Sequence, residues 1–110
     1  MVSVRSLLGY RMGMDRDEVI RRLRSYSVSA AALGVHSLHL FGSVARNEAD
    51  AESDVDVFVD YDPNRFGLVE LARLRRELTD VLGRRADAAT RDGLHPMLRA
   101  GIEREAVQVF

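Results

Sequence analysis

The chain has 110 residues, the size of one domain, and no cysteine, which excludes a disulfide framework and a thiolate metal site. Its 17 acidic residues balance 16 basic ones, so bulk charge gives no strong nucleic-acid signal. Every basic residue is arginine, and the absence of lysine excludes a lysine nucleophile, a Schiff base and a Walker lysine.

The sequence contains no segment that predicts membrane insertion or export. No apolar run approaches the roughly 18 residues that a membrane span needs. The N-terminus lacks the apolar segment that is typical of a signal peptide. We therefore expect a cytoplasmic protein that binds no membrane.

Residues 1–13 show no clear periodicity and are expected to be an N-terminal extension that need not be ordered. The domain is expected to cover residues 14–110. Asp15 is suited to cap a helix, with Glu18 three residues later as in a capping box. An apolar stripe at helical spacing follows, and Gly34 is a typical helix stop.

Two apolar runs in the middle of the chain predict strands. Residues 37–41 lead into Gly42-Ser43, a turn of small residues that can open a short helix. Residues 47–53 are polar and predict a loop. Residues 54–61 carry the best run of β-branched and aromatic side chains in the chain, which predicts a second strand.

The C-terminal half continues the alternation of helices and strands. Residues 68–82 form the clearest amphipathic helix, which Gly83 ends, and its leucine stripe is expected to lie in the core. Residues 86–90 predict a strand of small side chains. Pro96 predicts the first turn of another helix, and residues 106–110 predict a terminal strand.

The turn at Gly42-Ser43 and the acids Asp54 and Asp56 are the most informative features of the sequence. A small-residue turn after a strand can approach a phosphate closely with its backbone N–H groups. Acids two residues apart on a strand project to one face, where two carboxylates can share Mg²⁺ or Mn²⁺. A solvated strand end would also tolerate the two acids without any metal.

A third acid, Asp87, lies in a predicted strand whose small side chains leave room around it. Three converging carboxylates suit a two-metal site for phosphoryl or nucleotidyl transfer, with Asp87 as an extra ligand or base. Sequence spacing alone does not show that they converge. Asp60 would point to the same face of the strand as Asp56, but it lies about 13 Å further along the strand. This distance favours Asp87 as the third acid of the site.

Other polar side chains could act in the site or could simply be solvated at the surface. Arg46, three residues after the turn, can grip a phosphate, and Ser53 can cap the loop or bind a ligand. The histidines lack ligand spacing, and at most one is expected near the site. Five arginines are interpreted as a solvated helix face in preference to a partner-docking surface: Arg73, Arg75, Arg76, Arg84 and Arg85.

These motifs together resemble one known group of proteins. The runs FGSVAR at residues 41–46 and SDVDVFV at residues 53–59 are similar to the signature of the DNA polymerase β-type nucleotidyltransferase superfamily. More narrowly, the chain resembles the minimal nucleotidyltransferases, which are small stand-alone proteins. The ten residues between Ser43 and Asp54 make the match far more specific than a lone pair of acids, and it covers residues 15–110.

The resemblance implies an α+β nucleotidyltransferase fold, with a mixed sheet of about four strands flanked by helices. Gly42 and Ser43 are then expected to bind the triphosphate of ATP, and we add Arg46 to this group. The resemblance assigns catalysis and the binding of two Mg²⁺ ions to three acids: Asp54, Asp56 and Asp87.

The resemblance also implies a partner. Many minimal nucleotidyltransferases are antitoxins encoded beside a helical HEPN-type ribonuclease toxin, and members of that group transfer AMP from ATP onto a toxin tyrosine.

Two alternatives stay open, namely a non-catalytic toxin-binding antitoxin and a nucleotidyltransferase acting on a small molecule. The chain is short for a second substrate-binding domain. A haloacid-dehalogenase-like phosphatase needs a lysine, and D-x-D glycosyltransferases are much larger, so both are rejected.

Overall fold

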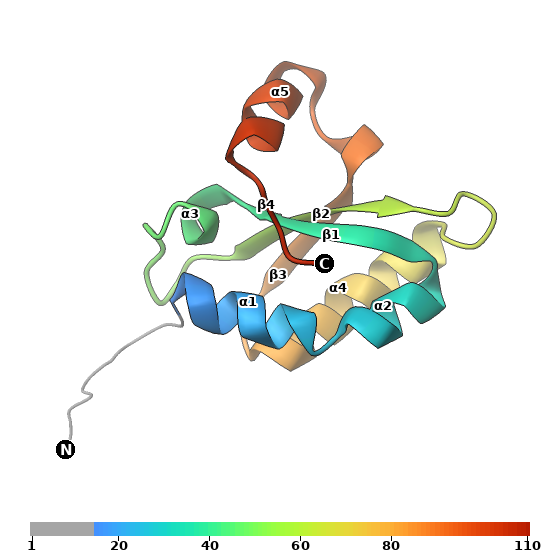
Figure 1. Ribbon diagram of the computed structural model, residues 1–110, viewed down its shortest axis with the longest axis horizontal. Coiled ribbons are helices and arrows are strands. Elements are labelled where there is room, and N and C mark those ends of the chain that lie inside the picture. The colour runs from blue at the N-terminus through green and yellow to red at the C-terminus, as the bar shows by residue number, and fades with distance from the viewer. Residues whose placement is uncertain (1–14) are drawn as a thin grey trace.

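The computed structural model describes residues 15–110, so the predicted extension over residues 1–13 lies outside the described residues. The described chain contains ten elements (Figure 1). In chain order they are α1 (Arg16–Arg24), α2 (Ser27–Leu33), β1 (Val35–Phe41), α3 (Gly42–Ala45), β2 (Val55–Tyr61), α4 (Leu68–Leu82), β3 (Ala86–Thr90), the single-turn helix η1 (Arg91–Gly93), α5 (Pro96–Glu105) and β4 (Val107–Gln108).

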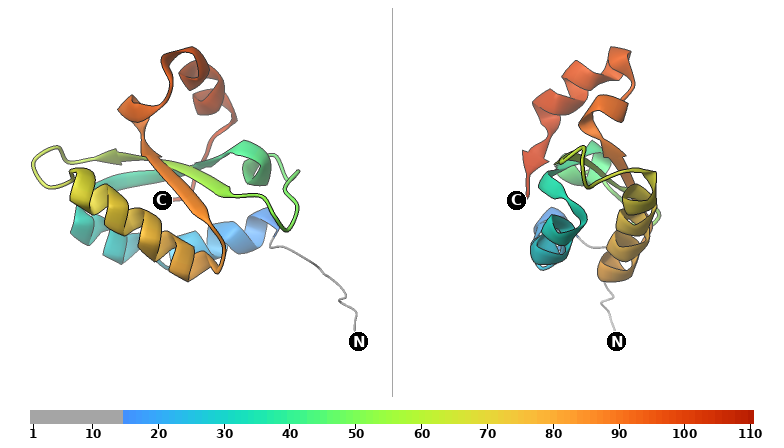
Figure 2. Two further views of the ribbon diagram at one scale, coloured as in Figure 1. Left: turned by 180° about the vertical axis from the view of Figure 1, so that it is seen from behind. Right: turned by 90° about the vertical axis from the view of Figure 1, so that its right-hand side faces the viewer.

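The strands form one mixed sheet in the order β3-β2-β1-β4. Strand β1 is antiparallel to both β2 and β4, whereas β2 and β3 are parallel. Helices α1, α2 and α4 cover one face of the sheet, and α5 stands over the other face (Figures 1 and 2). The predicted α+β fold with a mixed sheet of about four strands is therefore confirmed.

The side-chain alternation of β2 gives the sheet its two different faces. Val55, Val57 and Val59 have no exposed surface and face the three helices of the core. The intervening Asp56 and Asp60 project to the opposite face because successive strand residues point to opposite sides. One strand thus supplies both the core and the polar surface that carries the candidate site.

The predicted helix ends are confirmed by the backbone. The Asp15 carboxylate accepts a hydrogen bond from the Glu18 N–H at 2.9 Å and so caps α1. Gly34 ends α2 and Gly83 ends α4, at φ values of 103° and 69° that glycine adopts at little cost. These stops set where the chain turns back to the sheet.

Three predicted boundaries differ from the structure. Strand β1 begins two residues early because Val35 pairs with Tyr61 across a β-bulge, and β2 begins at Val55 instead of residue 54. The terminal strand is short: beyond β4 the pairing continues only as backbone hydrogen bonds between Leu38 and the last two residues. In the leucine stripe, Leu68 is 85% exposed because the first turn of α4 precedes the buried part of the helix.

A polar network holds α5 over the sheet, since none of the residues of α5 is buried. The guanidinium of Arg91 donates to both carboxylate oxygens of Asp60, at 2.7 and 2.9 Å, and to Glu103 of α5 at 2.7 Å. It also lies 4.7 Å from the centre of the Phe58 ring, on which His39 stacks. This network fixes the helix whose last residue reaches the candidate site.

Replacing Arg91 by alanine is expected to lower the free energy of unfolding by about 2 kcal/mol, because three charge-assisted hydrogen bonds are lost from a partly buried network. Urea unfolding followed by circular dichroism measures the change. Arg99→Ala is the matched control, since Arg99 makes one contact of 3.4 Å with Glu103 and is expected to lose less than about 1 kcal/mol. Equal losses in the two variants would contradict a special role for Arg91.

Candidate active site

A glycine turn packs directly against the acid in the centre of the site. Strand β1 ends at Phe41, the register partner of Asp56, and the next residue, Gly42, has a φ of 78°. A Cβ atom at position 42 would lie 2.4 Å from Oδ2 of Asp56. Glycine is therefore required here both by the backbone conformation and by the close approach of the turn to the carboxylate. Ser43 follows in the first turn of α3, partly buried.

The parallel pairing of β2 and β3 brings the third predicted acid to the site. Asp87 is the register partner of Asp56, so the two side chains lie beside each other on the same face of the sheet. Asp54 lies just before β2, where its Oδ2 is 3.6 Å from Nε of Arg85. The structure thus places Asp54, Asp56 and Asp87 at the same end of the neighbouring strands β2 and β3.

The three acids offer oxygen donors, but they do not form a complete metal site. Across residues 15–110, no three acidic, histidine or cysteine side chains converge closely enough to hold a metal ion as they stand. Carboxylate oxygens are nevertheless the donors that Mg²⁺ prefers, and the Gly42 turn leaves the space beside Asp56 free of side chain. The chemistry of the donor set therefore fits Mg²⁺, and these three acids are the residues that would hold it.

Asp56 is ionised at an energetic cost. Partial burial raises the pKa of Asp56 to about 6, and the carboxylates of Asp87 and Asp54 act in the same direction. Arg46 opposes this rise. An acid whose pKa is raised by folding destabilises the folded protein increasingly as the pH rises from its ordinary pKa to the raised one. The cost is complete above the raised pKa and absent at low pH.

Asp56→Asn is therefore expected to unfold at a higher temperature than the wild type at pH 8 without divalent cations. The free energy of unfolding should rise by about 1–2 kcal/mol, less than the full pKa shift implies because solvent screens a half-buried carboxylate, and roughly half of this gain should remain at pH 5. Thermal melts in EDTA across this pH range give the difference. A variant less stable than the wild type at pH 8 would show that the carboxylate is satisfied as it stands.

One site residue was not recognised from sequence: Glu105, at the end of α5. Its Oε2 accepts the backbone N–H of Gly42 at 2.8 Å, and both of its oxygens accept from Nη1 of Arg46, at 3.0 and 3.2 Å. Arg46 also donates to Glu48 at 2.9 Å. The only sequence signal was the place of Glu105 within residues 15–110, which the family resemblance covers, because its partners are 63 and 59 residues away.

The loop before Asp54 is held by protein contacts. The Ser53 hydroxyl and the Asp50 backbone N–H hydrogen-bond at 3.1 Å, so that Ser53 stabilises the loop. Arg84 donates to the carbonyl of Asp50 at 2.8 Å and to the carbonyl of Ser53. These contacts determine where Asp54 enters the site.

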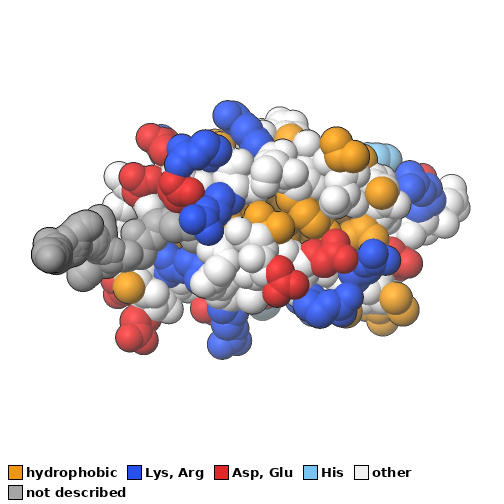
Figure 3. Space-filling model, turned by 90° about the horizontal axis from the view of Figure 1, so that it is seen from below, with side chains coloured by type: hydrophobic (Ala, Val, Ile, Leu, Met, Phe, Trp, Pro, Cys, Tyr) orange, Lys and Arg blue, Asp and Glu red, His pale blue; other side chains and the backbone are white. Residues whose placement is uncertain are grey.

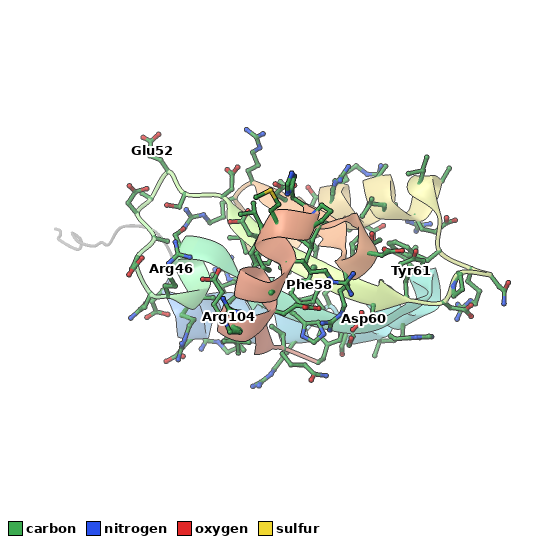
Figure 4. All side chains as sticks on the ribbon, turned by 90° about the horizontal axis from the view of Figure 1, so that it is seen from above. Arg46, Glu52, Phe58, Asp60, Tyr61 and Arg104 are labelled. Atoms are coloured by element: carbon green, nitrogen blue, oxygen red, sulfur yellow. The ribbon has the colours of Figure 1, made fainter. Side chains whose placement is uncertain are left out.

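Asp60 and His39 lie outside the candidate site. Figure 4 shows Arg46 and Asp60 toward opposite ends of the sheet, with Phe58 and α5 between them. Asp60 is bound by Arg91, and His39 belongs to the same network, where burial and Arg91 lower its pKa. The preference for Asp87 over Asp60 thus agrees with the geometry.

Four of the five arginines that the sequence places in one cluster make separate contacts. Arg73 pairs with Glu77 at 2.7 Å, and Arg75 donates to the carbonyl of Ala88 at 2.9 Å. Arg84 holds the loop and Arg85 lies near Asp54. Seen from below, acidic and basic side chains are interspersed on the helical face (Figure 3). The preference for a solvated surface over a basic docking patch agrees with this mixture. Across residues 15–110, no helix is both long and apolar enough to cross a bilayer.

Comparison with known proteins identifies the family. The model of the family "Nucleotidyltransferase domain" matches residues 17–109, which include the turn, the acids and Glu105. The chain belongs to this nucleotidyltransferase-domain family. The match extends over all strands of the sheet, so it concerns the whole described fold.

Individual relatives agree with the family assignment. "Putative protein adenylyltransferase MJ0435" of Methanocaldococcus jannaschii is 42% identical over 77 residues, covering 70% of this chain and 82% of the relative. The solved structure of a "putative minimal nucleotidyltransferase" has 39% identity and a TM-score of 0.72, covering 86% of this chain and 95% of that chain. A toxin–antitoxin structure with AMP-PNP has 18% identity and a TM-score of 0.64, covering 88% and 73%, and shares the fold.

Proposed function

We propose that the chain transfers AMP from ATP onto a protein acceptor with the help of Mg²⁺, and that it is the antitoxin of a HEPN-type toxin–antitoxin pair. The observation that carries the proposal is the contact between the Gly42 turn and Asp56, with Asp87 as its neighbour across the ladder. A backbone turn that lies close to grouped carboxylates is an arrangement that suits nucleotidyl transfer. The name of the M. jannaschii relative supports AMP as the transferred group and a protein as the acceptor.

Each predicted residue has a role in this mechanism. The Gly42 N–H, the Ser43 hydroxyl and the Arg46 guanidinium would bind oxygens of the triphosphate, all as donors to an anion. Asp54, Asp56 and Asp87 would hold Mg²⁺, which neutralises phosphate charge and lowers the pKa of a nearby hydroxyl. Asp87 is the exposed member of the three, which supports a role for it as the acceptor of the proton of an approaching hydroxyl.

The bond changes follow from this arrangement. The acceptor hydroxyl oxygen bonds to the α-phosphorus of ATP, the bond from that phosphorus to the β-phosphate oxygen breaks, and pyrophosphate leaves. The acceptor hydroxyl would belong to a second protein, as the name of the M. jannaschii relative, a protein adenylyltransferase, suggests. The toxin–antitoxin structure that shares the fold makes a toxin a reasonable acceptor to test.

The test incubates the protein with Mg²⁺, ATP and the protein encoded by the neighbouring gene. ATP labelled at the α-phosphate should label the acceptor, and ATP labelled at the γ-phosphate should not. Label from the γ-phosphate would indicate phosphoryl transfer, and label from neither would contradict the proposal of a protein acceptor. A small-molecule acceptor would be recognised by consumption of ATP with an unlabelled protein.

A further inference from the structure

The carboxylate of Glu105 occupies donors that the proposed function assigns to the triphosphate. The Gly42 N–H donates to Oε2 of Glu105 at 2.8 Å. The Arg46 guanidinium donates to both oxygens of the same carboxylate. A carboxylate with two acceptor oxygens between these donors resembles a phosphate group in charge and in hydrogen bonding.

We propose that Glu105 is an internal competitor of the nucleotide, whose carboxylate takes the place of triphosphate oxygens at Gly42 and Arg46 until the triphosphate displaces it. This inference rests on the proposed function. It assigns a role to a residue outside the predicted site and makes the affinity for ATP depend on the release of Glu105.

Competition follows from the chemistry of the groups. The Gly42 N–H has a single hydrogen, and it already has a well-placed acceptor in Glu105. A carboxylate and a phosphate both lack donors, so they cannot hydrogen-bond to each other and they repel as like charges. Glu105 also adds negative charge near Asp56, whose pKa it raises. A triphosphate can therefore bind these donors only if the Glu105 carboxylate leaves them.

The release of Glu105 requires only a local movement. Glu105 is the last residue of α5, and Ala106 after it is already extended. The helix itself stays attached through Glu103 and Arg91, and the chain beyond it stays paired to β1. Rotation of one side chain at a helix end is therefore sufficient. The Glu105 side chain is 29% exposed, which leaves it a path to solvent.

The experiment measures the binding of inorganic tripolyphosphate with Mg²⁺ by calorimetry, which tests the phosphate contacts without the adenine. Glu105→Gln keeps the shape but removes the charge, and should bind about tenfold more tightly than the wild type because a charge-assisted competitor is weakened. Glu48→Gln is the matched control, since Glu48 also contacts Arg46 but does not bind the Gly42 N–H. Its affinity should stay within about threefold of the wild type.

Thermal melts separate competition from a merely structural role. Without ligand, Glu105→Gln should melt below the wild type because Gly42 and Arg46 lose their anionic partner. With saturating tripolyphosphate and Mg²⁺, the variant should gain more in melting temperature than the wild type. A lower melting temperature with the same gain would indicate a structural role and overturn the inference.

The remaining outcomes also decide the question. Equal or weaker binding by Glu105→Gln, with clear binding by the wild type, overturns the inference and leaves the proposed function intact. Absence of binding in all proteins overturns both. In the wild type, the side-chain carboxyl ¹³C signal of Glu105 should shift on saturation with tripolyphosphate, and an unchanged signal would overturn the inference without any variant.

Discussion

Replacing Asp56 by asparagine is expected to lower the rate of AMP transfer at least about 1,000-fold while the protein stays folded. Asparagine keeps the size of the side chain but removes the charge that would bind Mg²⁺. Asp56 is the acid that lies against the Gly42 turn and beside Asp87, so its replacement removes the central carboxylate of the three. The rate is measured from the α-labelled acceptor under single-turnover conditions.

Asp60→Asn is the matched control for this loss. Asp60 lies on the same strand and the same face, but it is bound to Arg91 at the other end of β2. The control should lose stability and keep its transfer rate within about threefold, since it leaves the donors and acids of the site unchanged. Comparable losses of transfer in the two variants would contradict a specific role for Asp56.

Gly42→Ala is expected to lose at least about 100-fold in transfer for a stability loss of only about 1–2 kcal/mol. The stability loss comes from the φ of 78°. The activity loss has another cause, because the new methyl group would lie 2.4 Å from Oδ2 of Asp56 and force the carboxylate to rotate away. Urea unfolding and single-turnover transfer separate the two effects.

Gly83→Ala isolates the backbone contribution. Gly83 also has a positive φ, of 69°, but a Cβ atom there would meet nothing closer than Arg22 at 4.0 Å. It should lose a similar free energy of unfolding, about 1 kcal/mol, and transfer AMP at the wild-type rate. If Gly42→Ala kept its activity as well, the close approach of the turn to Asp56 would not matter for function.

The parts of the fold and site that depend on local sequence could be predicted. The glycine stop at Gly83, the cap at Asp15 and the alternation of β2 depend on neighbouring residues, and the structure confirms them. The convergence of Asp87 depended on the register of a parallel pair, which spacing does not define. The only local signal for Asp87 as a site residue was an acid among small side chains.

The contacts that the sequence did not reveal are long-range and polar. Glu105 binds Gly42 across 63 positions, and Arg91 binds Asp60 across 31. Hydrophobic periodicity carries no information about such partners, because a charged side chain on a helix is usually solvated. The exposure of Leu68 has a related reason, since the helical period defines a stripe but not where the sheet beneath it ends.

The central claim is that the turn and the acids transfer AMP to a protein partner. Its most direct test is the intact mass of the protein encoded by the neighbouring gene after co-expression with this chain. With the wild type, the partner should gain the mass of at least one AMP and lose its toxicity. With the Asp54→Ala and Asp56→Ala double variant, both changes should disappear. An unmodified partner that the double variant still neutralises would contradict the claim and leave a binding antitoxin.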